Sequence, residues 1–347
     1  MVVRNVGRIT SAVGRRARGR VRQLRARLSG ACRPAILMYH RIADESFDPW
    51  GLSVAPERFR QQLSWLATHR SLLSLAEFAR LHRVGQLPDD AVAVTFDDGY
   101  ACTAHVAAPL LVRYAIPVTI FLPAGLIGRT RHFWWDELAE IVMSHPDTSI
   151  CARGRTIDLG ERQAADAKWP RDNRKRTPRQ ESFYSLWAEL QPKSMDEIER
   201  ALAELSAQYP ASLEDERTRL MTREEVRSIA SDKVEFGSHA MSHASLPGLP
   251  SLEKAQEIRE SVEACQNLVG KRPVTFAYPF GDFDAECQAL VADAGFECAV
   301  AVETRAIAPD DDAFAFPRLK VGNWTWRQLR QELADASGQR SSHAIRA

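Results

Sequence analysis

Two adjacent carboxylates follow a short apolar segment of the chain. The apolar residues 91–96 lead directly to Asp97, Asp98 and Gly99. Successive side chains of a strand point to opposite faces, so the two aspartates can serve different partners, one binding a cation and the other moving a proton. An ordinary acidic turn after a strand has the same composition. Residues elsewhere in the chain must therefore separate these two interpretations.

A pair of histidines occurs about 140 residues later, again after a short apolar segment. Residues 234–237 lead to His239 and His243, which are four positions apart. On a helical turn this spacing places both imidazoles on one side, as would also be found on a solvated helix face. Two histidines and one aspartate are ligands that zinc and similar divalent ions accept, and they leave a position open for water. Together, the two motifs indicate a catalytic metal site.

These motifs resemble those of the polysaccharide deacetylase family, also called the NodB homology or carbohydrate esterase 4 family. Residues 95–100 are similar to its first motif, and residues 239–243 are similar to its second. The resemblance implies a hydrolase that uses a divalent metal ion, with zinc as the expected ion. It also implies one general base, Asp97, and three metal ligands: Asp98, His239 and His243.

A third segment resembles the family motif that stabilises the reacting oxygen. Residues 276–281 are similar to this motif, which implies that the backbone amide of Phe280 is the oxyanion donor. Ala277 stands where many family members have the arginine that pairs with the base. We expect Arg318 to replace it, the alternative being an ordinary surface arginine beside a strand.

The general acid of the family, a late histidine, has no counterpart in residues 319–326. Residues 35–41 instead form an early apolar segment that ends in Tyr-His-Arg and resembles exopolysaccharide-modifying members with a permuted motif order. This resemblance implies that His40 is the general acid. A strand-end histidine with a structural hydrogen bond is the alternative.

The segments that carry these residues each follow a β-prone apolar run, and helical stretches separate several of them. This alternation predicts an α/β barrel, in which site residues gather at the carboxyl ends of parallel strands. Further strands are predicted at 118–121, 299–302 and 318–321, which gives about seven. We therefore expect the distorted, incomplete (β/α)7-type barrel that the resemblance implies.

A long segment between the motifs predicts a helical insertion near the barrel mouth. Residues 133–221 are too many for one crossover and include a predicted hairpin at 149–159 and an amphipathic helix at 194–209. Trp134 and Trp135 either anchor this insertion or stack on sugar rings. The whole deacetylase domain is expected to span residues 31–335, with a polar tail at 336–347.

The first 30 residues form a basic arm with nine arginines and no acidic residue, although the whole chain has a net charge of only +1. We expect the arm to be either a merely disordered or RNA-sticky tail, a contact with an anionic membrane surface, or a targeting segment. It contains no long apolar run, and the six cysteines form no Cys-x-x-Cys pair. We expect a cytoplasmic enzyme that is either free in the cytoplasm or associated with a membrane. Its thiols should be reduced, and it should have no nucleic-acid partner.

The predicted reaction is hydrolysis of N-acetyl groups on amino sugars of a glycan or a lipid-linked glycan precursor. The same residues are compatible with a deformylase or an O-deacetylase acting on a small or lipid-attached sugar. A non-catalytic glycan-binding protein of the same fold is a third alternative. Retention of a base together with three metal ligands favours an enzyme.

Overall fold

The computed structural model describes residues 33–129, 132–170, 175–209 and 218–338. The basic arm predicted at 1–30 lies outside these residues, as does most of the predicted tail at 336–347. Among the described residues, none of the helices is both long enough and apolar enough to cross a bilayer. The location expected from the sequence therefore stays a prediction.

The centre of the molecule is an eight-stranded, all-parallel sheet that curves into an open barrel. Its order is β10-β1-β3-β4-β7-β8-β9, and β2 pairs separately with β3. The order ends at β9 and β10, so the barrel is incomplete, as predicted. The strands are β1 (Ala35–Tyr39), β2 (Ser71–Leu73), β3 (Ala91–Phe96), β4 (Val118–Leu122), β7 (Val234–Ser238), β8 (Thr275–Ala277), β9 (Cys298–Val300) and β10 (Leu319–Lys320). The three-residue strand β2 is the one that the sequence pattern did not predict.

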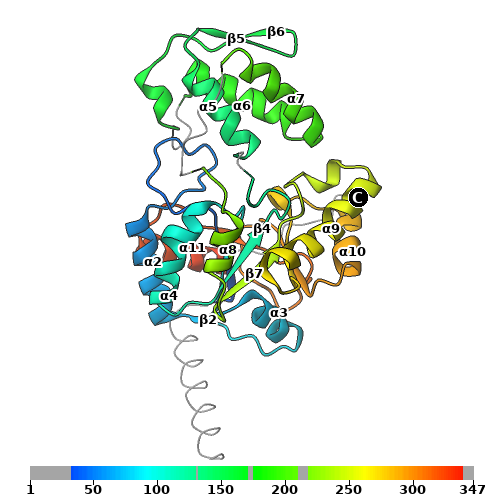
Figure 1. The fold of residues 1–347 in the computed structure, drawn as a ribbon. Helices are drawn as coiled ribbons and strands as arrows, with labels where there is room; N and C mark the ends of the chain where they lie inside the picture. Colours follow the sequence, from blue (N-terminus) through cyan, green and yellow to red (C-terminus); the bar gives the residue numbers. More distant parts are fainter. Residues whose placement is uncertain (1–32, 130–131, 171–174, 210–217, 339–347) are drawn as a thin grey trace, which may run out of the picture.

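Helices cover the outside of this sheet (Figure 1). They are α2 (Pro56–His69), α3 (Leu75–Arg83), α4 (Ala108–Arg113), α8 (Arg223–Ser228), α9 (Ser251–Val269), α10 (Ala285–Asp293) and α11 (Trp326–Gly338). Ser74, Thr222 and Asp284 begin α3, α8 and α10, and each side chain accepts a hydrogen bond from a backbone amide in the first turn. These caps satisfy amides that have no partner within the helix, which is why each helix begins where it does.

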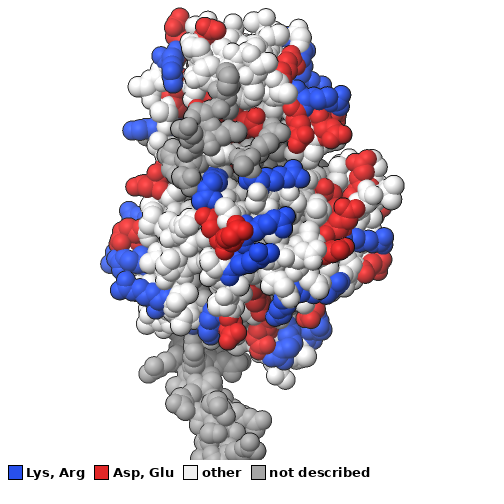
Figure 2. All heavy atoms as spheres, viewed as in Figure 1, with Lys and Arg blue, Asp and Glu red and all other residues white. Residues whose placement is uncertain are grey.

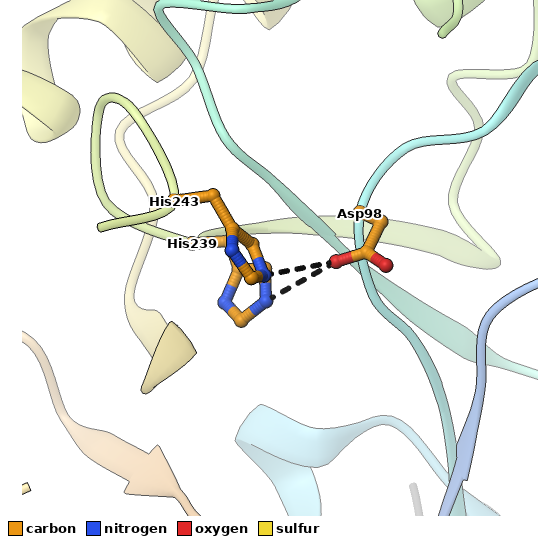
Figure 3. A group of neighbouring side chains, drawn as sticks. All are labelled: Asp98, His239 and His243. Carbon is orange, nitrogen blue, oxygen red and sulfur yellow. Dashed lines mark ion pairs between the residues drawn. The ribbon is translucent and has the colours of Figure 1, made fainter. Parts of the chain in front are cut away.

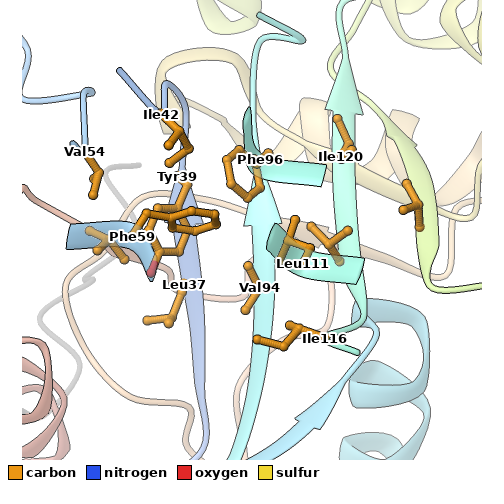
Figure 4. Packing of buried hydrophobic residues seen from close by; sticks show 14 of the residues in the cluster. Leu37, Tyr39, Ile42, Val54, Phe59, Val94, Phe96, Leu111, Ile116 and Ile120 are labelled. Atoms are coloured by element: carbon orange, nitrogen blue, oxygen red, sulfur yellow. The ribbon is translucent and has the colours of Figure 1, made fainter. Parts of the chain in front are cut away.

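Strands β1, β3 and β4 are mostly apolar because both of their faces are covered. Every residue of β1, β3 and β4 is buried. On one face Tyr39, Phe59 and Phe96 pack together, and Leu111 of α4 joins the same cluster (Figure 4). A parallel sheet buried on both sides has this continuous apolar pattern rather than an alternating one. This rigid core positions the carboxyl ends of the strands.

The segment after β4 forms a separate layer above the barrel (Figure 1). It contains α5 (Trp134–Ser144), β5 (Ser149–Ala152), β6 (Arg155–Asp158), α6 (Pro178–Leu190) and α7 (Met195–Ser206), and it has its own hydrophobic core. The predicted hairpin and amphipathic helix are both present. Helix α6 was not predicted, because its first residues lie in a polar, basic stretch. Lys, Arg, Asp and Glu side chains are mixed over the outer surface of this layer and of the barrel (Figure 2).

Trp134 and Trp135 are only 6% and 5% exposed and belong to the core of this layer. They therefore anchor the insertion, which was the interpretation that the sequence favoured. The Trp135 ring also lies against the ring of His243, one of the predicted metal ligands.

A buried arginine joins α5 to α6. Arg179 is 1% exposed, and its guanidinium donates hydrogen bonds to the carbonyl oxygens of Val142, His145 and Asp147, at 2.8, 2.9 and 3.0 Å. These oxygens lie at the carboxyl end of α5 and just beyond it, where helical partners are missing. One side chain thus satisfies three carbonyls of the insertion.

We expect Arg179→Met to destabilise the insertion by about 2–4 kcal/mol, because it leaves buried carbonyls without donors. Hydrogen exchange should show faster exchange in α5 and α6 and little change in the barrel strands. The control is Arg155→Met, which removes an exposed ion pair with Glu189 and should change stability by less than about 0.5 kcal/mol. Equal effects of the two substitutions would contradict this role of Arg179.

Candidate metal and catalytic site

The six residues predicted for the site all follow strands of the barrel. His40 follows β1, Asp97 and Asp98 follow β3, and His239 follows β7. Phe280 lies in the short 3-10 turn after β8, and His243 lies four residues beyond His239. Parallel strands all end at one edge of the sheet, which brings residues distant in the sequence to one mouth. All six line a single cavity of about 620 Å³.

Asp98, His239 and His243 form a compact, buried group of potential metal ligands (Figure 3). One potential ligand atom from each residue lies within 4.8 Å of the other two. Asp98 Oδ1 is 3.5 Å from His239 Nε2 and 3.2 Å from His243 Nε2, and it is buried without a hydrogen-bond partner. A buried carboxylate oxygen that faces two imidazole nitrogens fits a divalent cation.

The carbonyl oxygen of Ala277 fixes the tautomer of His239, and burial favours the neutral form of His243. His239 Nδ1 is 2.7 Å from the carbonyl oxygen of Ala277, so Nδ1 carries the proton and Nε2 presents its lone pair toward Asp98. Burial lowers the pKa of His243, which favours its neutral form.

The turn that carries the two histidines is not helical, so this part of the prediction was wrong. Ala240 and His243 have φ values of 62° and 60°, in the left-handed region. The side chain of Glu257, on α9, accepts hydrogen bonds from the amides of Met241 and Ser242, both at 2.9 Å. These bonds hold a conformation that L residues rarely adopt. Nothing in the His-x-x-x-His spacing indicated Glu257.

Asp97 is paired with the arginine that the sequence suggested. Arg318 donates from Nη1 to Asp97 Oδ1 at 2.7 Å and from Nη2 to Oδ2 at 2.6 Å, and its Nε donates to the carbonyl oxygen of Ala301 at 3.0 Å. Arg318 is fully buried, so the surface alternative was wrong. Burial opposes ionisation of Asp97, but the charge of Arg318 lowers the pKa of the carboxyl below its ordinary value. Arg318 therefore pairs with Asp97 although position 277 is an alanine rather than an arginine.

His40 and Phe280 line the same cavity as these groups. His40 Nε2 is 4.0 Å from Asp97 Oδ2, and burial lowers the pKa of the imidazole. Phe280 has a φ of 60°, and its ring packs against that of His243 at 4.6 Å. Asp98, His243 and Phe280 thus all have left-handed backbone conformations, which are found most often where function requires a fixed geometry.

A hydrogen-bonded group ties the insertion to the first motif. Tyr100 Oη donates to Asp136 Oδ2 at 3.0 Å and accepts a hydrogen bond from Trp135 Nε1 at 3.2 Å. Arg41, next to His40, lies 3.8 Å from Asp136. Burial raises the pKa of Asp136 to about 7 despite this positive charge. The start of α5 is therefore held directly against segments that carry site residues.

We expect Arg318→Met to destabilise the protein by about 3–5 kcal/mol at pH 7, because it leaves the Asp97 carboxylate buried without a partner. In the variant burial raises the pKa of Asp97, so its folded form takes up a proton as the pH falls. The difference in free energy of unfolding between the wild type and the variant, measured by urea unfolding, should then be smaller at pH 4 than at pH 7.

The control for this prediction is the double variant Asp97→Asn, Arg318→Met, which has no buried charge at this position. It should recover part of the lost stability and show no such pH dependence. A gap that is the same at both pH values would show that Asp97 is not the cause of the destabilisation.

Comparison with protein-family models gives a match to the model described as polysaccharide deacetylase. It covers residues 85–155 and 193–299, slightly more than half of the chain. The Bacillus subtilis protein YxkH, which is named as a polysaccharide deacetylase, is 27% identical over 146 residues, 40% of this chain and 51% of that protein. A poly-beta-1,6-N-acetyl-D-glucosamine N-deacetylase of Escherichia coli K12 is 33% identical over 126 residues, 31% of this chain and 19% of that protein. The matches thus span about half of YxkH and a fifth of the Escherichia coli protein.

Solved structures have the same fold. Deacetylase PplD of Streptococcus pyogenes, in complex with acetate, aligns with a TM-score of 0.57 at 16% identity over 86% of this chain and 97% of that chain. IcaB of Ammonifex degensii aligns with a TM-score of 0.55 at 18% identity over 88% of this chain and 98% of that chain. The open α/β barrel is therefore an arrangement already known from these proteins.

Proposed function

The chain belongs to the polysaccharide deacetylase family, and from this premise we propose that it hydrolyses N-acetyl groups on amino sugars of a glycan. One observation carries the proposal: an arginine-paired carboxylate, Asp97, lies in the same cavity as the potential ligands Asp98, His239 and His243. Relatives named as poly-beta-1,6-N-acetyl-D-glucosamine N-deacetylases support an N-acetylated amino sugar as the substrate.

Asp98, His239 and His243 would hold a divalent metal ion, and two imidazoles with one carboxylate suit zinc. When bound, such an ion supplies Lewis acidity, which polarises an acyl oxygen and lowers the pKa of water toward about 7. His239 Nδ1 keeps its proton and donates a hydrogen bond to the carbonyl oxygen of Ala277. This bond would keep the imidazole in one orientation throughout the reaction.

Asp97 is the proposed general base. Its two oxygens are fixed by Arg318, which keeps the carboxyl ionised and prevents it from rotating. It removes one proton from the attacking water while the oxygen of that water adds to the acyl carbon. The Phe280 amide donates to the oxygen on which negative charge develops, an interaction stronger in the transition state than in the ground state.

His40 is the proposed acid for the departing amine. Because burial lowers the pKa of His40, its imidazole is neutral at pH 7 in the free site and must gain a proton before it can donate one. Asp97 Oδ2 is 4.0 Å from His40 Nε2, which is beyond direct hydrogen-bond distance, so the proton taken from water would pass from Asp97 to His40 through one bridging water. It then reaches the amide nitrogen as the C–N bond breaks, which releases acetate and a free amino sugar.

The first test is acetate release from N-acetylated glycans with and without a chelator. We expect EDTA to reduce release at least 100-fold and added zinc to restore it, since Lewis acidity is worth several kcal/mol to the reaction. Asp97→Asn should abolish turnover with the metal retained, whereas His239→Ala should lose the metal, as measured by elemental analysis of the purified protein.

Equal metal loss in both variants would contradict this division of roles between Asp97 and His239. If zinc-loaded protein released no acyl group from a broad panel of N-acetylated glycans, the proposed activity itself would be wrong.

The second test concerns the leaving group. His40→Asn should lower kcat about 10²–10⁴-fold, the usual contribution of general acid catalysis, without loss of the metal. The control is His105→Asn, which removes an exposed imidazole paired with Glu225 and should leave kcat within about twofold of the wild type. A near-normal rate in the His40 variant would show that another group protonates the amine.

A further inference from the structure

The two histidines of the proposed metal site are held in place in different ways. His239 Nδ1 donates a hydrogen bond to the carbonyl oxygen of Ala277 at 2.7 Å, which orients its ring directly. His243 Nδ1 is buried and has no hydrogen-bond partner among the described residues. Its ring packs instead against those of Trp135 and Phe280, at 4.9 and 4.6 Å between centroids. The position of His243 therefore depends on ring packing and on the backbone turn that carries it.

The turn contains no side chain that could orient His243 from within. Ala240 and Met241 have apolar side chains, and the hydroxyl of Ser242 donates to Glu257 Oε1 at 2.7 Å. Ala240 and His243 also have left-handed backbone conformations, with φ values of 62° and 60°. Such conformations cost free energy in L residues and persist only where surrounding contacts enforce them. The contacts that hold this turn must therefore come from other elements.

Backbone groups just after β4 hold the carbonyl side of the turn. The amide of Ala124 donates to the carbonyl oxygen of Ala240 at 3.1 Å, and that of Gly125 donates to the carbonyl oxygen of Met241 at 2.9 Å. A Cβ atom at position 125 would lie only 2.9 Å from the Met241 oxygen, so this close approach requires glycine. These bonds leave the amides of Met241 and Ser242 to a different partner.

Glu257 of α9 is that partner. Its Oε2 accepts hydrogen bonds from the amides of Met241 and Ser242, both at 2.9 Å, while its Oε1 accepts the Ser242 hydroxyl. All the described hydrogen bonds of this carboxylate thus go to the turn. Bonds to an ionised acceptor are stronger than those between neutral groups. Since α9 packs on β7, the carboxylate connects the turn to a helix of the rigid barrel.

We propose that Glu257 is a positioning residue of the metal site and that it acts through His243. By holding the amides of the turn, it keeps His243 Nε2 at 3.2 Å from Asp98 Oδ1. The inference rests on the proposed function, because it treats His243 as a metal ligand. It adds that metal affinity depends on a carboxylate outside the group of potential ligands, whereas the orientation of His239 does not depend on this carboxylate.

The first test measures the zinc affinity of the full chain by competition with a coloured chelator. Glu257→Met removes both acceptor oxygens and should weaken zinc binding about 10–100-fold, as is usual when a group that orients a metal ligand is lost. Glu257→Gln keeps one acceptor for the amides and a donor for the Ser242 oxygen, so it should retain most of the affinity. The matched control is Glu260→Met, at an exposed position of the same helix, which should bind zinc like the wild type. If the wild type binds zinc and the two methionine variants bind it equally well, the proposal is wrong.

Nitrogen-15 NMR of the histidine rings in metal-free protein separates this inference from the proposed reaction. In Glu257→Met we expect the signals of His243 to shift or broaden, while those of His239 keep the pattern of a ring protonated at Nδ1. This result supports the positioning role even if the wild type binds no zinc or releases no acetate, in which case only the proposed function fails. Changes of equal size in both rings, or in neither, would contradict the role of Glu257.

A second variant covers the case in which Glu257→Met does not fold. Glu257→Asp keeps the charge but is one methylene shorter, so its carboxylate cannot reach all three donors of the turn. It should weaken zinc binding and alter the His243 signals in the same direction as Glu257→Met. Zinc affinity and ring signals identical to those of the wild type in this variant would equally overturn the proposal.

Discussion

The buried ion pair between Asp97 and Arg318 is the contact on which the site depends. A carboxylate in a water-poor cavity is costly unless its charge is compensated, and a two-point contact with a guanidinium both compensates and orients it. Arg318 lies just before β10 and also binds the carbonyl of Ala301, just after β9. It therefore connects both edges of the open barrel to the end of β3. The same side chain that keeps Asp97, the proposed base, ionised thus also joins these strand ends.

Around this pair, the backbone rather than the side chains sets much of the geometry. Asp98, His243 and Phe280 all adopt left-handed conformations, each of which costs free energy in an L residue. Contacts from the fold compensate for that cost: Glu257 holds the histidine turn, and the carbonyl of Ala277 holds the ring of His239. The potential ligand atoms therefore already face one another, so the proposed ion would need little reorganisation to bind.

The insertion has its own core, yet it is not independent of the barrel. Trp135 packs within that core, donates a hydrogen bond to Tyr100 and lies against His243. A shift of α5 would therefore move a ring that contacts a proposed metal ligand. Because α6 packs on α5, the insertion and the proposed site residues are parts of one packed unit.

The sequence by itself determined the six proposed site residues and the barrel that gathers them, because short, continuous apolar runs locate buried parallel strands and such strands deliver their last residues to one edge. It also restricted the partner of Asp97 to a testable candidate, Arg318. Only the tertiary structure decided the non-helical histidine turn and the role of Glu257. These contacts join segments far apart in the chain, and their geometry depends on how whole elements pack rather than on any local spacing of residues.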